Sequence, residues 1–341
     1  MTAGAIGLGV LGVGRIGQIH ARNIATRIPG ARLAALYDPR PGVAEELSGQ
    51  LGGTKTHSSE EDLMADPAVD AVVICSSTDT HARLIEAAAA AGRPIFCEKP
   101  ISIDLDTVDR ALEAVDRAGV PLQIGFNRRF DPNFREVRRA VQAGEIGTPE
   151  ILRITSRDPG PPPLDYIAVS GGLFFDMTIH DFDMARYQTG SEPRSVYAVA
   201  GVRVDPRIGE AGDVDTAVVT IEFENGVYCT IDNSRRAAYG YDQRLEFFGS
   251  KGMARAENDL PHRATLSDET GVRSALPLHF FLERYQASFQ AELLSFVEAL
   301  HSGRAPEVGG KDGRVPVLMA RAANRSVAER RPVSLEEVDG G

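Results

Sequence analysis

The chain has 341 residues, enough for about two domains, and its composition is that of an ordinary globular protein. Its formal net charge of −11 disfavours nucleic acid and anionic membrane surfaces as partners, because basic patches bind both. Cys75, Cys97 and Cys229 lack metal-ligand spacing and are expected to be small core residues. The apolar N-terminal run is short and lacks a basic flank, so we expect a cytoplasmic protein.

The first predicted strand, residues 5–11, leads into a glycine motif. Residues 12–17 read Gly-Val-Gly-Arg-Ile-Gly, and a helical pattern follows at once. Gly12 permits a tight turn, Gly14 lets the backbone approach a pyrophosphate, and Gly17 lets the helix and strand pack closely. In this strand–turn–helix context the motif indicates dinucleotide binding at a helix N-terminus.

The second predicted strand, residues 32–38, ends in a carboxylate. Asp38 lies about 20 residues past the glycine motif, where a ribose-binding acid is expected. It favours NAD, because it would repel a 2′-phosphate, while the nearby Arg40 leaves NADP open as a weaker alternative. The competing interpretation is that Asp38 only caps the turn at residues 38–41.

Strands and helices continue to alternate through the first third of the chain. Thr78 and Asp79 are candidate caps for the helix that follows the third strand. The pattern predicts a parallel, doubly wound α/β sheet, a Rossmann domain over residues 1–125 that binds NAD. The remaining elements predicted there are a helix at 44–51, a helix that begins at 59–62, a strand at 70–75, a helix at 81–91, a strand at 93–97, a helix at 105–118 and a strand at 120–124.

The fourth strand ends in Glu98-Lys99-Pro100. In a doubly wound sheet this strand lies beside the first at the switch point, where ligands bind. Lys99 is therefore expected near the reactive end of the cofactor, although a solvated loop lysine is the alternative. A cis Lys99–Pro100 bond is a further hypothesis, since proline tolerates it in tight turns.

After residue 125 the pattern changes to strands in series, which indicates an antiparallel sheet. We expect an α+β domain over residues 126–341, with a large open sheet, that serves substrate binding and oligomerisation. Glu224-Asn225-Gly226 predicts a hairpin turn. The predicted strands are 151–156, 195–204, 216–223, 227–232, 244–249 and 253–257, and the predicted helices are 135–143, 283–301 and 312–329.

Asp176 and His180 are four residues apart in a helix-compatible run, so they share one helical face. A carboxylate beside an imidazole can fix its tautomer and hold it as a base. Surface or capping pairs have the same spacing. A metal site with Asp183 is another alternative, but it is disfavoured because a dinucleotide already supplies the electrophile, and no metal is expected.

Several motifs together resemble the glucose–fructose oxidoreductase, inositol dehydrogenase and rhizopine-catabolism (GFO/IDH/MocA) family. The last two of them resemble its inositol dehydrogenase branch. The matching pieces are residues 12–17 with His20-Ala21, residues 98–100, 125–132, 176–183 and 232–244.

The resemblance implies NAD-dependent oxidation of one ring hydroxyl of an inositol to a ketone, by a homotetramer. It implies that Lys99, Asp176 and His180 are catalytic. His180 would be the base, Asp176 its orienter, and Lys99 the group that stabilises the oxyanion. Asn127 departs from the family pattern, in which an apolar residue is expected, and this affects substrate identity more than reaction class.

A polyol has hydroxyls all round and needs several polar anchors. Arg129 is expected to be structural, and Tyr241 to pack. The candidate substrate anchors are Arg128, Asp158, Tyr239 and Asn127; the candidate cofactor-binding residues are Gly12, Gly14, Arg15, Ile16, Gly17, Asp38, Arg40, Ser76, Thr78, His81, Glu98 and Lys99. Alternative functions are an NAD(P)-dependent dehydrogenase or reductase of another polyol or hexopyranose, and a non-catalytic dinucleotide-binding sensor.

Overall fold

A computed structural model describes residues 4–167 and 169–339, which form two compact units. The first unit contains the chain up to Phe130 and also residues 287–317. The second contains residues 131–286 and the chain from Leu318 onward. This differs from the predicted division at 125/126, because a later segment of the chain returns to the first unit.

The first unit contains a six-stranded parallel sheet in the order β3-β2-β1-β4-β5-β6. This order confirms the predicted doubly wound sheet. The strand beside β1 is β4, which is the third predicted strand, whereas the predicted fourth strand is β5 and pairs with β4 and β6. The prediction that the strand ending at Glu98 lies beside the first was therefore wrong, because the two-residue β3 was not predicted. The elements are β1 (Ile6–Leu11), α1 (Arg15–Thr26), β2 (Ala31–Tyr37), α2 (Val43–Gln50), β3 (Lys55–Thr56), α3 (Glu60–Ala65), β4 (Ala71–Ile74), α4 (Thr78–Ala90), β5 (Ile95–Glu98), α5 (Leu105–Ala118), β6 (Leu122–Gly125), a 3₁₀ helix (Asn127–Phe130), α11 (Gln286–Ser302) and the start of α12 (Gly310–Glu329).

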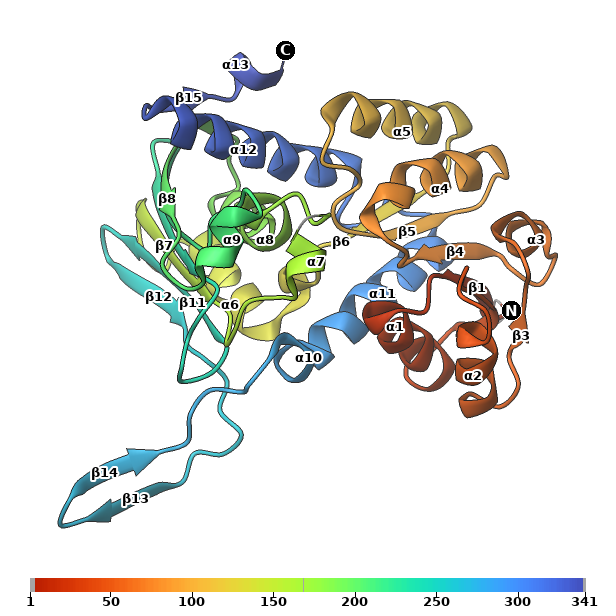
Figure 1. Ribbon diagram of the computed structural model, residues 1–341, viewed down its shortest axis with the longest axis horizontal. Coiled ribbons are helices and arrows are strands. Elements are labelled where there is room, and N and C mark those ends of the chain that lie inside the picture. The colour runs from red at the N-terminus through yellow and green to blue at the C-terminus, as the bar shows by residue number, and fades with distance from the viewer. Residues whose placement is uncertain (1–3, 168, 340–341) are drawn as a thin grey trace. The chain divides into compact units, whose positions relative to one another are not determined.

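Helices cover both faces of this sheet (Figure 1): α1, α2 and α11 lie on one face, and α4 and α5 on the other. Val10 and Phe96 of the strands are fully buried against Leu293 and Phe296 of α11. This apolar packing explains why residues 287–317 belong to the first unit, since α11 buries its apolar side there.

The second unit contains a seven-stranded sheet in the order β12-β11-β7-β10-β9-β8-β15. Its neighbouring strands are antiparallel except for the parallel pair β7 and β10, so the predicted mostly antiparallel sheet is confirmed. The elements are α6 (Pro132–Gln142), β7 (Pro149–Arg157), α7 (Leu164–Ile167), a π-helical turn (Phe174–Thr178), α8 (Ile179–Thr189), β8 (Pro193–Gly201), α9 (Pro206–Glu210), β9 (Thr216–Phe223), β10 (Tyr228–Ser234), β11 (Asp242–Gly249), β12 (Gly252–Ala256), β13 (Thr265–Asp268), β14 (Gly271–Ser274), α10 (Phe281–Arg284), the end of α12, β15 (Val333–Ser334) and α13 (Glu336–Asp339).

The two faces of the seven-stranded sheet differ. Helices α6 and α8 pack on one face (Figure 1). The other face exposes apolar side chains at alternate strand positions, among them Tyr197, Val199 and Val218. The predicted turn at Asn225-Gly226 joins β9 to β10, with Gly226 at a φ of 85°.

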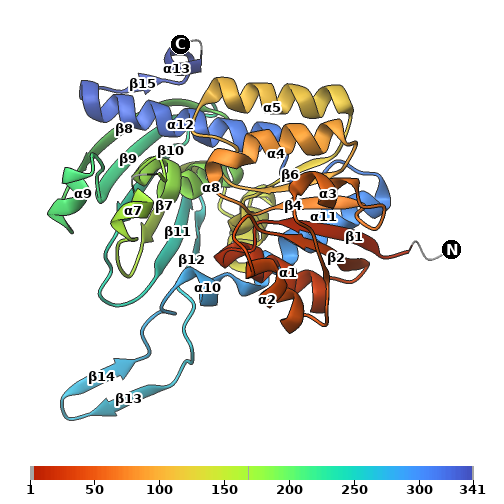
Figure 2. The same ribbon diagram turned by 45° about the vertical axis from the view of Figure 1, so that its right-hand side comes forward.

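Strands β13 and β14 form a separate two-stranded hairpin that extends away from this sheet in both views (Figures 1 and 2). All eight of its strand residues are exposed. The sequence did not predict this hairpin. In the described part of the chain, the helices fall short of the length and apolarity that crossing a membrane requires.

Candidate active site

The glycine turn after β1 has the geometry that a dinucleotide pyrophosphate needs. Gly12 has a φ of 89°, and a Cβ atom at Gly17 would lie 1.9 Å from the carbonyl oxygen of Gly12. By contrast, a Cβ at Gly14 would meet no atom within 4 Å. Gly14 is the N-cap of α1 and has no side chain that could cap the helix. The backbone N–H groups at the helix start, at Arg15 and Ile16, therefore suit a phosphate.

Asp38 follows β2 and lies against this turn. Its carboxylate accepts hydrogen bonds from the backbone N–H of Val13 at 2.9 Å and from Arg40, whose Nε donates at 2.8 Å. Partial burial acts to raise the pKa of Asp38, but the bonds from Arg40 and Val13 outweigh it and hold the pKa below its usual value. An ionised carboxylate at this place suits a ribose hydroxyl as hydrogen-bond acceptor. The guanidinium of Arg40 is hydrogen-bonded to the same carboxylate.

The turn between β4 and α4, together with the first turn of α4, holds three of the predicted cofactor residues, Ser76, Thr78 and His81. Helix α4 begins at Thr78 with Ser77 as N-cap, so the prediction that Thr78 or Asp79 caps it was wrong. The Ser76 hydroxyl lies 2.6 Å from that of Thr80. His81 is buried, with Nδ1 2.8 Å from the carbonyl oxygen of Pro100 and Nε2 3.1 Å from that of Ser76. Burial lowers the pKa of His81, and its contact with Pro100 links α4 to the next turn.

That next turn is Glu98-Lys99-Pro100, at the carboxyl end of β5. The Lys99–Pro100 peptide bond is cis, as predicted. Lys99 is half-buried, which argues against the solvated loop lysine. Glu98 is bound to Nε2 of His20 in α1 at 2.7 Å.

The 3₁₀ helix after β6 places two predicted substrate anchors in the first unit. Asn127 and Arg128 are both buried. Nδ2 of Asn127 has no hydrogen-bond partner among the described residues, which is costly for a buried donor unless a ligand accepts from it. Arg129 donates to Asp312 at 2.9 Å and is structural, as predicted.

The Asp176 and His180 pair lies in the second unit. Asp176 belongs to the π-helical turn that runs directly into α8, and His180 to the first turn of α8. Single π turns inside α-helices occur frequently at functional sites. Both residues are partly buried, so the pair is not a solvated surface pair.

Asp176 is held by groups from two other segments. Nη1 of Arg235 lies 3.0 Å from Asp176 and 3.8 Å from Asp158, and the Tyr166 hydroxyl donates to Asp176 at 2.9 Å. The Arg235 side chain is only 1% exposed, and its Nε and Nη2 have no hydrogen-bond partner among the described residues. Arg235 therefore brings together the two predicted carboxylates, Asp158 and Asp176.

Tyr239 makes a different set of contacts. Its hydroxyl donates to Asp242 at 2.5 Å and accepts from Arg157 at 3.1 Å. Burial, with the bond to Asp242, raises the pKa of Tyr239. Tyr241 is buried against the ring of Tyr285, so it packs as predicted.

Sequence reasoning missed Arg235 and Tyr166. Arg235 lies in the run that carries the family resemblance, but an arginine after a predicted strand reads as a surface residue. Only the tertiary structure shows that it is buried against carboxylates. The three thiols are buried and form no disulfide, as expected, and burial raises the pKa of each.

Comparisons with known proteins agree with this architecture. Residues 6–126 match the model of an oxidoreductase family with an NAD-binding Rossmann fold, and residues 134–255 match that of the GFO/IDH/MocA C-terminal domain. The chain is 53% identical to a myo-inositol 2-dehydrogenase of Thermotoga maritima, over 98% of this chain and 99% of the relative.

Two solved structures show the same fold. A probable dehydrogenase from Thermotoga maritima is 52% identical with a TM-score of 0.96, covering 98% of this chain and 100% of that one. A scyllo-inositol dehydrogenase from Lactobacillus casei with bound NAD(H) and scyllo-inositol is 31% identical with a TM-score of 0.89, covering 97% and 99%. The chain therefore belongs to the GFO/IDH/MocA family of NAD-binding oxidoreductases.

Proposed function

We propose that this protein oxidises a ring hydroxyl of myo-inositol, or of a related inositol isomer, to the ketone, with NAD as the hydride acceptor. The observation that carries the proposal is the Asp176 carboxylate, fixed by Arg235 and Tyr166 one turn before His180. Support also comes from the Thermotoga maritima relative named myo-inositol 2-dehydrogenase and from the Lactobacillus casei structure with NAD(H) and scyllo-inositol.

The cofactor roles rest on the first unit. Gly14 and the start of α1 receive the pyrophosphate, and Asp38 accepts the hydrogen bonds of the adenosine ribose. NAD, when bound, supplies the carbon that accepts the hydride. Ser76, Thr78 and Glu98 line its path, while His81 supports the turn that carries Lys99.

The proton of the alcohol is handled by three residues. His180 takes it from the reacting hydroxyl, and Asp176 orients the imidazole. Lys99 stabilises the negative charge that develops on the oxygen. Asn127, Arg128, Asp158 and Tyr239 bind the other hydroxyls of the ring, and Nδ2 of Asn127 is a ready donor.

The proposal includes a homotetramer in the cytoplasm. The apolar face of the seven-stranded sheet supports assembly, since exposed apolar patches of this kind mark interfaces. Three free thiols fit a reducing compartment. Light scattering of the purified protein and fractionation of the source cells test these two points.

Purified protein with NAD or NADP and a panel of inositols and aldohexoses tests the reaction. NADH should form with myo-inositol or another inositol. Turnover of glucose without turnover of any inositol would contradict the inositol assignment and indicate a hexopyranose substrate. NADH binding with no turnover on any polyol would favour the sensor.

Two substitutions test the roles. Lys99→Ala and His180→Ala should each lower kcat by roughly 10²- to 10⁴-fold, because each removes a group that acts on the reacting oxygen. NADH binding should persist in His180→Ala. His279→Ala, at an exposed histidine, is the control and should keep full activity. Near-normal kcat in either variant would contradict the assignment.

A further inference from the structure

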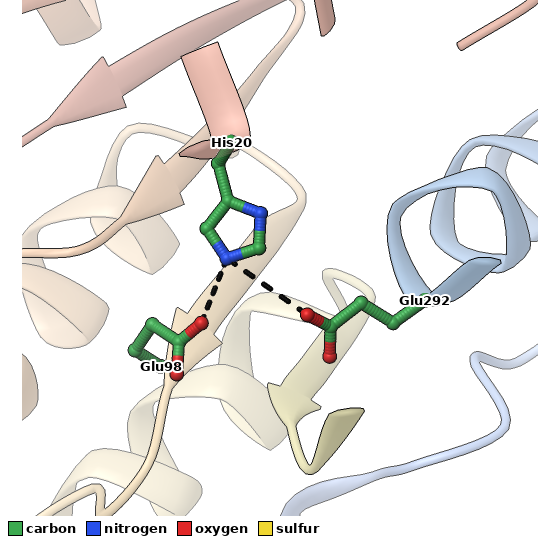
Figure 3. Close-up of side chains that lie close together, drawn as sticks. All are labelled: His20, Glu98 and Glu292. Atoms are coloured by element: carbon green, nitrogen blue, oxygen red, sulfur yellow. Dashed lines mark hydrogen bonds and ion pairs between the residues drawn. The ribbon is translucent and has the colours of Figure 1, made fainter. Parts of the chain in front are cut away.

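A cluster of three titratable side chains lies inside the first unit, behind the turn that carries Lys99. His20 comes from α1, Glu98 from the end of β5 and Glu292 from α11, with one ligand atom of each within 4.8 Å of the others. Nε2 of His20 lies 2.7 Å from Oε1 of Glu98 and 3.9 Å from Oε1 of Glu292 (Figure 3).

The surroundings of His20 and Glu292 are closed and largely apolar, whereas the side chain of Glu98 is 13% exposed. The side chains of His20 and Glu292 are fully buried. The imidazole lies between the rings of Phe96 and Phe289, with centroids 5.2 and 5.8 Å away. Among the described residues, neither carboxylate oxygen of Glu292 has a hydrogen-bond partner, and neither does Nδ1 of His20.

These contacts define the protons of the cluster. An imidazolium would leave a buried Nδ1–H without an acceptor, whereas a single proton on Nε2 faces Glu98. An ionised Glu292 would be a buried charge with no donor, a few ångströms from the Glu98 carboxylate. A protonated Glu292 avoids both the cost of a buried charge and the repulsion from the Glu98 carboxylate.

We propose that Glu292 is a positioning residue that stays protonated at neutral pH and thereby leaves the His20 N–H entirely to Glu98. Once ionised, Glu292 would attract that N–H and repel the Glu98 carboxylate. The neutral form therefore fixes Glu98 and the turn that begins at Lys99. This role rests on the proposed function, because Glu98 and Lys99 are among the proposed cofactor residues.

The other groups around Glu292 agree with a neutral carboxyl. The titratable groups that face it are His20 from α1, Glu98 from β5 and the thiol of Cys75 after β4, while Gln123 of β6 donates to its backbone carbonyl. Burial, together with the charge of Glu98, raises the pKa of Glu292 well above its ordinary value.

A divalent cation is the competing occupant, since imidazole and carboxylates also bind metals. The 2.7 Å separation between Nε2 and Oε1 is that of a hydrogen bond with the proton between the two atoms. Such a bond uses the nitrogen that a metal would need. The proton is therefore the favoured occupant.

Infrared spectroscopy tests the protonation directly on the full-length protein. The wild type should show the carbonyl stretch of a protonated, buried carboxyl group at neutral pH, and Glu292→Gln should lack it. Absence of the band from the wild type would overturn the proposal. So would elemental analysis that finds one divalent metal per chain in the wild type and none in Glu292→Gln.

The positioning role is tested by NADH fluorescence titrations across pH. Wild-type affinity should weaken by up to about tenfold per pH unit once Glu292 ionises, whereas Glu292→Gln should keep its neutral-pH affinity without that loss. Identical pH profiles would reduce Glu292 to a structural residue and overturn the role. His20→Gln, which keeps an N–H donor, is the matched control, and Glu292→Met replaces a Gln variant that does not fold.

Neither measurement uses a polyol. If the protein does not turn over any inositol, the proposed function fails, but both measurements still test Glu292. Failure of the proposed function and failure of the Glu292 role are therefore distinguishable.

Discussion

At the scale of single residues, the carbonyl oxygen of Gly12 decides what position 17 can hold. Because a Cβ at Gly17 would lie 1.9 Å from this backbone atom, Gly17→Ala must displace α1 from β1. We expect a loss of about 1–3 kcal/mol in the free energy of unfolding, the usual cost of overpacking, together with weaker NADH binding. Denaturant titration and NADH fluorescence measure the two effects.

Gly14→Ala is the matched control for that prediction. Its Cβ meets open space, and its φ of −66° is accessible to alanine, so stability should stay unchanged. NADH should nevertheless bind more weakly, because the methyl group occupies the place of the pyrophosphate. Equal stability of the two variants would contradict the packing argument.

Asp242 gives a prediction for acid stability. Burial acts to raise the pKa of its carboxyl, but hydrogen bonds from Arg244, Tyr239 and Asn258 hold the pKa below its ordinary value. A depressed pKa contributes stability above the unfolded-state pKa, and this contribution is lost as the pH falls through the folded-state pKa.

Asp242→Asn should therefore cost about 1–3 kcal/mol at neutral pH, and the difference from the wild type should shrink below about pH 4. Free energies of unfolding measured across this range check it. Glu113→Gln, at an exposed carboxylate of α5, should follow the wild type throughout. If the difference in free energy of unfolding between Asp242→Asn and the wild type stays constant with pH, Asp242 does not contribute to the pH dependence of stability.

At the residue scale, the sequence predicts positions where the geometry follows from local spacing. The glycine motif, Asp38 and the Asp176–His180 pair each lie within one turn or one strand–helix unit. Arg235 did not follow, because its partners Asp158 and Asp176 are 77 and 59 positions earlier in the chain and meet it only through the fold. Likewise, the spacing of His20, Glu98 and Glu292 in the sequence does not predict that their side chains are in contact.

At the scale of elements, alternating strands and helices were enough to predict the parallel sheet, since each strand–helix unit is local. The return of α11 to the first unit was not predictable, because an amphipathic stripe shows that a helix packs and not which sheet receives it. The parallel pairing of β7 with β10 was hidden for the same reason, since these strands are distant in sequence.

The hairpin of β13 and β14 yields a prediction about an element. All of its strand residues are exposed, so it buries little apolar surface. Replacing residues 263–275 by Gly-Asn-Gly should leave the melting temperature of the second unit unchanged. Replacing the Asn225-Gly226 turn with Ala-Ala is the contrasting control, which should destabilise, because β9 and β10 are central strands. A clear drop on hairpin removal would mean that another surface covers the hairpin.

At the scale of the whole molecule, the exposed apolar sheet face carries the prediction on assembly. Val199 and Val218 are cross-strand neighbours, 58% and 54% exposed. The double variant Val199→Glu/Val218→Glu should break the proposed tetramer into smaller species, because it places two charges in the buried centre of an interface. Light scattering coupled to gel filtration measures this.

Ala25→Glu, on the exposed side of α1, is the control for that experiment and should leave the assembly intact. If the double variant keeps the wild-type mass, assembly through this face is excluded.

The path of the chain between its two units has a consequence for how the gene can change. The chain leaves the first unit after Phe130, returns after Gln286 and leaves again after Val317. Neither unit is encoded by one continuous stretch of codons. A recombination event that exchanged only the first 130 codons would pair the strands of one parent with the α11 of another. Such an exchange keeps the first unit packed only where both parents match at Leu293, Phe296 and their contacts.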